Sequence, residues 1–231
     1  MVAQSPDVVS TVPGHRLTDP AWVSARIGEM GRSWGTDTPR VAGTLWWCMV
    51  ASSLVDQIAR AYAAGTPAPI AALGDFDCEV RPDGGVEHTE FRRVVVDGTG
   101  RAVRSDVGGV RGADADEAVA TALRETLTAV IAQVATASGA GAPSLWAVVA
   151  DAIGNRALDA GAPEAATRLA TDLGTPLPTP RFVTVGGRTF VRRASCCLVY
   201  EVSGCQMCTS CPKRSPAERA ELLADAARSR S

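Results

Sequence analysis

The stretch TPRVAGTLWWCMVASSLVDQIARAYAAG, residues 38–65, decides the fold because it combines length, hydrophobicity and clear ends. A threonine followed by a proline opens it, a pair that suits a helix cap and the first helical position. The run stays largely apolar as far as Gly65, a residue type that commonly ends helices. We therefore predict a long, largely buried helix in which Trp46, Trp47 and Cys48 are core residues.

Helical spacing recurs along the chain, and two other regions alternate like strands. Further helices are expected from Pro20, at residues 114–137, 144–160 and 163–173, and after a capping box that runs from Ser215 to Glu218. Residues 78–109 and 181–202 contain β-branched runs broken by Asp-Gly or Gly-Gly turns, which is typical of hairpins. In the first of these regions we expect Cys78 to be an ordinary buried thiol and His88 a surface residue.

A proline-rich connector, GTPLPTPRF at residues 174–182, separates the helical part from the second hairpin. Its prolines oppose both a helix and a central strand. We therefore predict two domains, residues 1–180 and residues 181–231.

Bulk properties indicate a cytoplasmic protein with a normal core. The chain has 231 residues, of which 46% are hydrophobic, so it can fold without disulfides. Its first residues show no basic start followed by an apolar run, so we expect no secretory signal. Uncharged residues 41–55 are too short to span a membrane, and turn-forming residues interrupt residues 126–150. We predict no transmembrane segment, while peripheral contact with a membrane surface stays open.

The segment ASCCLVYEVSGCQMCTSCPKR, residues 194–214, holds five of the seven cysteines. In a reducing compartment such a cluster favours metal binding or redox chemistry over structural disulfides. Two overlapping Cys-x2-Cys units and an adjacent pair can supply the four thiolates of a zinc site or an iron–sulfur cluster. The five thiols are Cys196, Cys197, Cys205, Cys208 and Cys211.

The adjacent pair, Cys196 and Cys197, favours iron–sulfur over zinc. Neighbouring residues on an extended chain point to opposite faces, which suits a single zinc ion poorly. A two-iron cluster is larger and can accept both if the backbone turns at the strand end. Zinc binding stays open as the alternative. Thiol–disulfide exchange is weaker, because no strand precedes and no helix follows the Cys-x2-Cys unit as in a thioredoxin-like site.

The pattern Cys196-Cys197, ten residues, Cys208, two residues, Cys211 resembles the C-terminal motif of the FhuF-like ferric-siderophore reductases. The flanking sequences RRASCCLVY and CPKR are also similar to that family. The resemblance implies that Cys196, Cys197, Cys208 and Cys211 hold a 2Fe-2S cluster. The departure is Cys205, which could form an equally good chelating loop with Cys208; we favour Cys205 as a bystander.

The same resemblance implies a fold and an activity. The fold would be α+β, a helix-rich domain with a small antiparallel sheet, similar to siderophore synthetases, followed by a compact cysteine-rich C-terminal segment. The activity would be one-electron reduction of a ferric siderophore to release Fe(II) in the cytoplasm. The siderophore would bind in the cavity between helices and sheet.

The charge distribution suggests the electron donor. Residues 181–214 carry six basic residues against one acidic residue, Glu201, although the whole chain has a net charge of −2. A basic patch on an acidic protein favours an anionic ligand or an acidic partner such as a ferredoxin. The glycine-rich residues 98–109 lack the strand–turn–helix setting of a dinucleotide site, so we interpret them as a hairpin loop.

Other function classes find less support in the sequence. A zinc-knuckle binding module without redox activity is the main alternative. A DNA-binding redox regulator would need a helix-turn-helix with a basic recognition face, and we expect no nucleic-acid partner. A synthetase-like transferase would need a nucleotide site, for which this chain is short.

Overall fold

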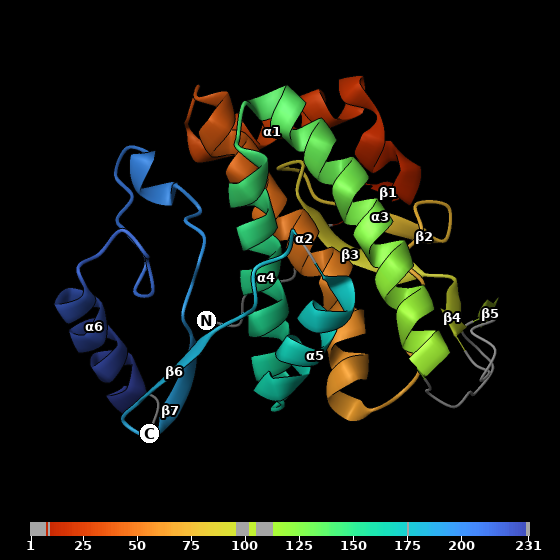
Figure 1. The fold of residues 1–231 in the computed structure, drawn as a ribbon. Coiled ribbons are helices and arrows are strands. Elements are labelled where there is room, and N and C mark those ends of the chain that lie inside the picture. The colour runs from red at the N-terminus through yellow and green to blue at the C-terminus, as the bar shows by residue number, and fades with distance from the viewer. Residues whose placement is uncertain (1–7, 9, 96–101, 105–112, 175, 230–231) are drawn as a thin grey trace.

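The computed structural model describes residues 8, 10–95, 102–104, 113–174 and 176–229. Helix α2, Pro39–Ala64, lies at the centre of the molecule and packs against every other long helix (Figure 1). These neighbours are α1 (Pro20–Trp34), α3 (Ala113–Ser138), α4 (Ala142–Asp159) and α5 (Pro163–Leu173). The helix predicted from the sequence is therefore confirmed, including its end at Gly65, which adopts a left-handed conformation.

Two tryptophans of α2 join separate parts of the core. Trp46 and Trp47 are both fully buried. The Trp46 indole N–H donates to the carbonyl of Gly84, in the turn of a hairpin, and the Trp47 indole N–H donates to the carbonyl of Leu145 in α4. A buried indole needs such a partner, so these bonds align α2 with both neighbours. The predicted core role of both residues is confirmed.

A small antiparallel sheet in the order β1-β2-β3 covers one side of α2. Its strands are β1 (Ser10–Pro13), β2 (Phe76–Val80) and β3 (Val86–Phe91). Cys78 is fully buried in β2, opposite Val12 and Thr89, while His88 is exposed on β3. Both match the expectation. Strand β1 leads into a 3-10 helix at Gly14–Thr18. The sequence did not predict this strand, because its four residues do not alternate between buried and exposed and only pairing with β2 defines it.

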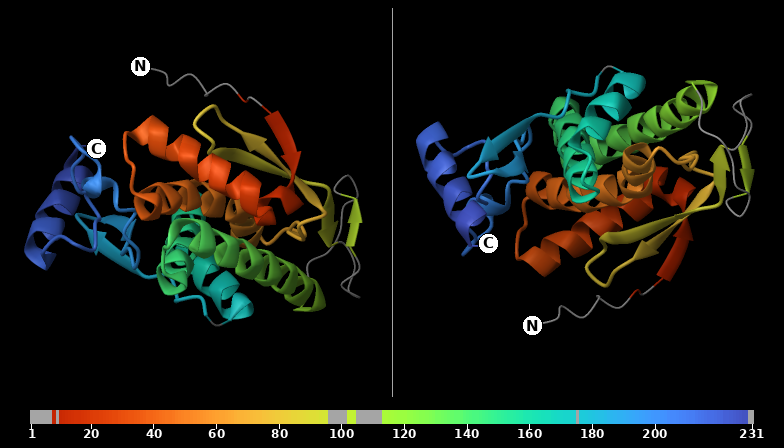
Figure 2. Two further views of the ribbon diagram at one scale, coloured as in Figure 1. Left: turned by 90° about the horizontal axis from the view of Figure 1, so that it is seen from above. Right: turned by 90° about the horizontal axis from the view of Figure 1, so that it is seen from below.

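The remaining elements lie at opposite ends of the helical layer (Figure 2). At one end is the short hairpin β4 (Arg93–Val95) and β5 (Ala102–Arg104). Apart from β5, the glycine-rich residues 98–109 lie outside the described residues. At the other end are the hairpin β6 (Phe182–Val185) and β7 (Arg188–Val191), a 3-10 helix at Val199–Glu201, and helix α6 (Pro216–Arg228).

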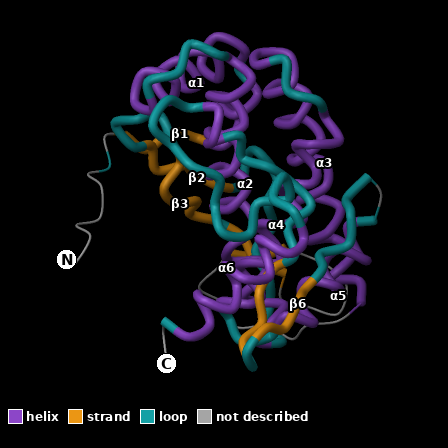
Figure 3. The backbone as a smooth tube through the Cα atoms, turned by 90° about the vertical axis from the view of Figure 1, so that its left-hand side faces the viewer, coloured by secondary structure: helices purple, strands orange, loops and turns teal. Residues whose placement is uncertain are grey.

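The C-terminal elements form one side of the molecule (Figure 3). Strand β7 packs against α4, and α6 packs against β6. The Ser215 hydroxyl accepts a hydrogen bond from the Glu218 N–H at 3.2 Å, which is half of the predicted capping box. The chain is thus a helix-rich α+β protein with a small antiparallel sheet and a cysteine-rich C-terminal segment, as expected. The division at residue 180 stays a prediction.

Among the described residues, one helical segment, Ala115–Ser138 of α3, is long and apolar enough to cross a membrane by length and composition alone. In the structure its apolar face is turned into the protein core, where Leu123, Leu127 and Val134 are fully buried. A core helix passes the same test of length and composition, so this helix is weak support for a membrane span.

We expect the contact between α2 and the end of α3 to tolerate no side chain at Gly43. A Cβ atom there would lie 2.3 Å from the Ser138 Cβ, so Gly43→Ala should lower the free energy of unfolding by about 2 kcal/mol. Urea denaturation would measure this change. Gly28→Ala in α1 is the control, because its nearest neighbour is 3.6 Å away and alanine should stabilise that helix by up to about 1 kcal/mol. Equal effects of the two substitutions would contradict the packing argument.

Candidate metal centre

Four of the five C-terminal cysteines lie in two facing pairs. The Sγ atoms of Cys196 and Cys211 are 3.8 Å apart, and the thiols of Cys197 and Cys208 share a hydrogen bond. A tetrahedral metal with metal–sulfur bonds of about 2.3 Å holds two thiolates about 3.8 Å apart. The first pair therefore has the spacing of two thiolates on one metal atom.

The arrangement in pairs suits two metal atoms better than one. Within the described part of the chain, no group of three or more His, Cys, Asp or Glu side chains is arranged to hold a metal ion, so the thiols are described as two pairs. Structural zinc needs four ligands around one atom, whereas a two-iron cluster divides four thiolates between two irons. Two pairs of thiols therefore match the number and the division of ligands that a 2Fe-2S cluster needs.

The backbone turns sharply directly after the adjacent cysteines. Leu198 has a φ angle of 63°, and among the described residues it alone combines a positive φ with a side chain. The turn directs the Leu198 N–H to the Cys196 sulfur and the Val199 N–H to the Cys197 sulfur. Such N–H···S bonds stabilise negative sulfur. The strained residue therefore lets adjacent thiols face different partners, which is the backbone turn expected of a two-iron site.

A buried carboxylate, Asp151 of α4, binds residues 194–214 to the helical core. We call these residues the thiol segment. Its side chain accepts hydrogen bonds from the Ala194 N–H at 2.8 Å, the Ser195 N–H at 2.9 Å and the Ser195 hydroxyl at 2.6 Å. The Arg193 Nε lies 3.4 Å from the same carboxylate. No role for Asp151 was predicted from the sequence. The available signal was an acidic residue in the middle of the apolar helix SLWAVVADAIGNRAL.

Two arginines bind the part of the thiol segment around Cys208. The Arg193 Nη1 is 3.6 Å from the Cys208 Sγ, and the Arg214 Nε donates to the Cys208 carbonyl at 2.9 Å. Arg214 also donates to the carbonyl of Met207. Both guanidinium groups are largely buried, so their positive charge acts on the thiols with little screening.

The thiols respond unequally to these surroundings. The hydrogen bond from Cys208, supported by the Val199 N–H and by Arg193, lowers the pKa of Cys197 to about 5 although burial opposes this. The same bond raises the pKa of Cys208 above its ordinary value. Burial, and then the Cys211 thiol, raises the pKa of Cys196. Metal binding must displace the protons that these thiols carry, so it should release protons.

Cys205 and Cys48 lie outside the pairs, as does Cys78 in the sheet. Cys205 packs against the hydrophobic core, and its N–H donates to the Val202 carbonyl at 3.1 Å. The proposed ligand Cys197 packs against the core as well, so the bystander role of Cys205 stays a prediction. Cys48 is close enough to Cys197 and Arg193 to feel their charges, and burial raises the pKa of its thiol to about 12. We predicted Cys48 as a core residue, and it does pack against the core, although partly buried.

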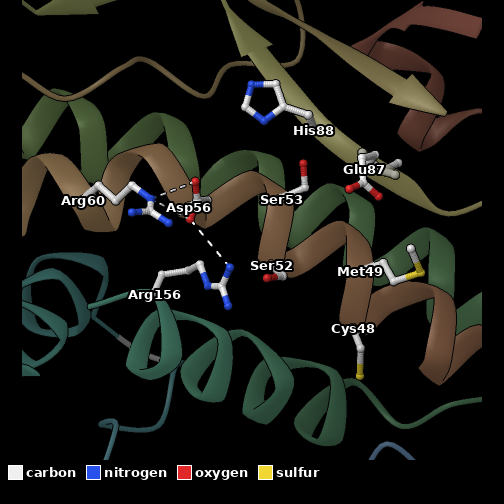
Figure 4. A pocket seen from close by; sticks show the side chains of 10 residues that line it. Cys48, Met49, Ser52, Ser53, Asp56, Arg60, Glu87, His88 and Arg156 are labelled. Atoms are coloured by element: carbon white, nitrogen blue, oxygen red, sulfur yellow. Dashed lines mark hydrogen bonds and ion pairs between the residues drawn. The ribbon is translucent and has the colours of Figure 1, made fainter. Parts of the chain in front are cut away.

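A cavity of about 410 Å³ lies between α2, α4 and β3 (Figure 4). One wall is a polar stripe of α2 at four-residue spacing, Cys48, Ser52, Asp56 and Arg60. We call this cavity the polar groove. Asp56 lies 3.0 Å from the Nε of Arg60 and 3.8 Å from Arg156, which projects from α4. The groove is in the position expected for a cavity between helices and sheet, but none of the five C-terminal cysteines lines it.

The basic patch is smaller than the residue count suggested. Arg193 and Arg214 are bound to the thiol segment, and the Arg188 Nη1 donates to the Ala226 carbonyl in α6 at 3.2 Å. The three basic residues of this region that stay exposed are Arg181, Arg192 and Lys213. About half of the predicted patch therefore has a structural role.

Comparison with known protein families supports this site. Residues 193–213 match the family model described as the FhuF 2Fe-2S C-terminal domain. The matched segment contains both thiol pairs and Cys205. The resemblance to the FhuF family is thereby confirmed over this segment, and the 2Fe-2S cluster is the cofactor that it implies. No curated protein matches the chain.

We expect Asp151→Asn to weaken the anchoring of the thiol segment and to cause cluster loss. The substitution removes the charge that strengthens several buried hydrogen bonds, which should cost about 2–3 kcal/mol locally. Iron and sulfide per chain, counted after anaerobic purification, should fall well below the unmodified protein. Asp159→Asn is the matched control, because Asp159 ends the same helix, is 52% exposed and pairs only with Arg156 among the described contacts. Unchanged iron and sulfide in Asp151→Asn would refute the anchoring role.

Proposed function

We propose that this protein is a cytoplasmic ferric-siderophore reductase. Cys196, Cys197, Cys208 and Cys211 would hold a 2Fe-2S cluster that passes one electron to Fe(III) in a siderophore, so that the iron leaves as Fe(II). The observation that carries the proposal is the arrangement of these thiols as two facing pairs within the segment that matches the 2Fe-2S domain.

Reduction is itself the release step in this chemistry. Siderophores bind iron through hard oxygen donors, which hold Fe(III) far more tightly than the less charged Fe(II). A 2Fe-2S centre supplies one electron at a time, which is the number that this change requires. No general acid, base or nucleophile is needed.

The surrounding residues would set the conditions for electron transfer. The buried guanidinium of Arg193 beside Cys208, together with Arg214, places positive charge near the thiolates. Positive charge favours the more negative, reduced state and raises the reduction potential. The Leu198 and Val199 N–H groups act in the same direction.

The electron would come from a separate carrier, for which an acidic ferredoxin is our proposal. Arg181 and Arg192 are exposed and adjacent, because the Arg192 N–H donates to the Arg181 carbonyl at 2.7 Å. They lie directly before β6 and directly after β7, on the C-terminal side of the molecule, where an acidic surface could dock.

We expect serine substitution to separate the four proposed ligands from Cys205. Cys196→Ser, Cys197→Ser, Cys208→Ser and Cys211→Ser should each abolish or strongly alter the visible absorption of anaerobically purified protein, whereas Cys205→Ser should retain it. Iron, zinc and inorganic sulfide should be counted in the same samples. Colourless protein with about one zinc per chain would favour the zinc-knuckle alternative. Bleaching by Cys205→Ser but not by Cys208→Ser would show that the ligand set is wrong.

We expect cluster reduction by an acidic ferredoxin to depend on ionic strength and on the exposed arginines. The second-order rate should fall by about tenfold between low and physiological salt, because screening weakens electrostatic association. Arg181→Glu combined with Arg192→Glu should slow the low-salt rate to a similar degree. Reduction by dithionite, which needs no docking surface, is the control and should not change. A rate independent of both salt and these charges would exclude docking at this hairpin.

A further inference from the structure

A second cavity, of about 470 Å³, opens directly onto one of the proposed cluster ligands. Its wall includes Cys196 together with Arg40 and Thr44 of α2, Ser144 of α4, and Lys213. We call it the Cys196 cavity. Its volume lies within the range of about 300–1,000 Å³ that is common for small-molecule sites. A small ligand bound there would therefore lie against a thiol of the metal centre.

The charges around the Cys196 cavity favour an anion. Its wall contains two cations, Arg40 and Lys213, and no acidic residue. Glu201 pairs with Arg40 at 2.6 Å, but it lies outside the wall and the pair is partly exposed, so it holds Arg40 only weakly. Arg40 also occupies the first turn of α2, where the helix dipole disfavours a cation. The stability of α2 therefore does not explain why a cation occupies position 40.

Helix α4 adds to this positive field. Gly141, its N-cap residue, lines the cavity and provides no side-chain cap, and the first turn contains no acidic residue. The positive end of the α4 dipole is therefore uncompensated by side chains at the wall of the cavity. The Ser144 hydroxyl lies on the same wall, while the Thr44 and Ser195 hydroxyls on it donate to the Arg40 carbonyl and to Asp151.

The polar groove is the competing location, and the structure favours it less. Its wall carries two acidic residues, Asp56 and Glu87, beside the cations Arg60 and Arg156, whereas the wall of the Cys196 cavity carries none. A smaller cavity continues the groove toward the thiols, but its wall holds Asp151 and Arg193 and no proposed ligand. Because electron-transfer rates fall steeply with distance, an iron bound in the Cys196 cavity would have the more direct path.

We infer that the Cys196 cavity binds the ferric siderophore and selects chelates with a net negative charge, such as those built from carboxylate or catecholate groups, over neutral trihydroxamates. This inference rests on the proposed function. In the reaction one electron leaves the reduced cluster and converts Fe(III) to Fe(II), while the oxygen donors keep their bonds to carbon and become weak ligands. The electron carrier then restores the reduced cluster.

Ser144→Glu tests the inference without disturbing the thiols. Ser144 is exposed in the first turn of α4, where an acidic residue is favourable for the helix, so the fold should be kept. Gallium(III) citrate is the probe, because Ga(III) resembles Fe(III) in charge and size but is not reduced. Isothermal titration of the full chain with its cluster should show about tenfold weaker binding in Ser144→Glu and no change in Ser144→Gln.

Three further measurements locate the effect. Lys213→Gln should weaken binding of gallium(III) citrate by a few-fold. A neutral gallium(III) trihydroxamate should bind weakly and respond little to Ser144→Glu. Arg60→Glu, which changes an exposed residue of the polar groove, should leave citrate binding unchanged. Weaker binding in Arg60→Glu but not in Ser144→Glu would move the chelate to the groove and overturn the inference, as would indifference to both charge changes.

The inference and the proposed function fail in different ways. Dithionite-reduced protein mixed with ferric citrate and an Fe(II) indicator measures electron transfer separately from binding. Charge-dependent binding without Fe(II) formation would refute the reductase function and keep the anion site. Fe(II) formation that Ser144→Glu leaves unchanged would refute the site and keep the function.

Discussion

The interaction on which the site depends is the buried carboxylate of Asp151. It accepts hydrogen bonds from two successive backbone N–H groups and one hydroxyl in residues 194–195, directly before the adjacent cysteines. A carboxylate with 5% exposure is costly unless such partners surround it. The Trp47 indole fixes α4 against α2. Asp151 of α4 therefore connects the thiol segment to the packed helical core.

The thiol segment combines this rigid anchor with a strained turn. Leu198 adopts a conformation that side chains disfavour, and the result is that neighbouring thiols reach separate partners. The two facing pairs explain why an adjacent Cys-Cys unit suits a two-iron cluster. Cys205 belongs to neither pair.

Charge is divided between two tasks in the C-terminal region. Arg193 and Arg214 point inward, where both bind Cys208 and place positive charge beside the thiols. Arg181 and Arg192 stay on the surface, available to a protein partner. Lys213 joins Arg40 at the Cys196 cavity, which lies between α2, α4 and the thiol segment. A net charge summed over the segment could not distinguish these roles.

By itself the sequence determined the long helices, the hairpins, the thiol spacing and the metal-binding character of residues 194–214. Each of these follows from local rules, such as capping residues, the spacing of apolar residues and turn chemistry. Only the tertiary structure decided which thiol faces which, that Asp151 anchors the segment, and that a cavity meets Cys196. The reason is distance along the chain: Asp151 and Ser195 are 44 residues apart, and Arg40 and Glu201 are 161 apart. Such partners meet only when the helices have packed.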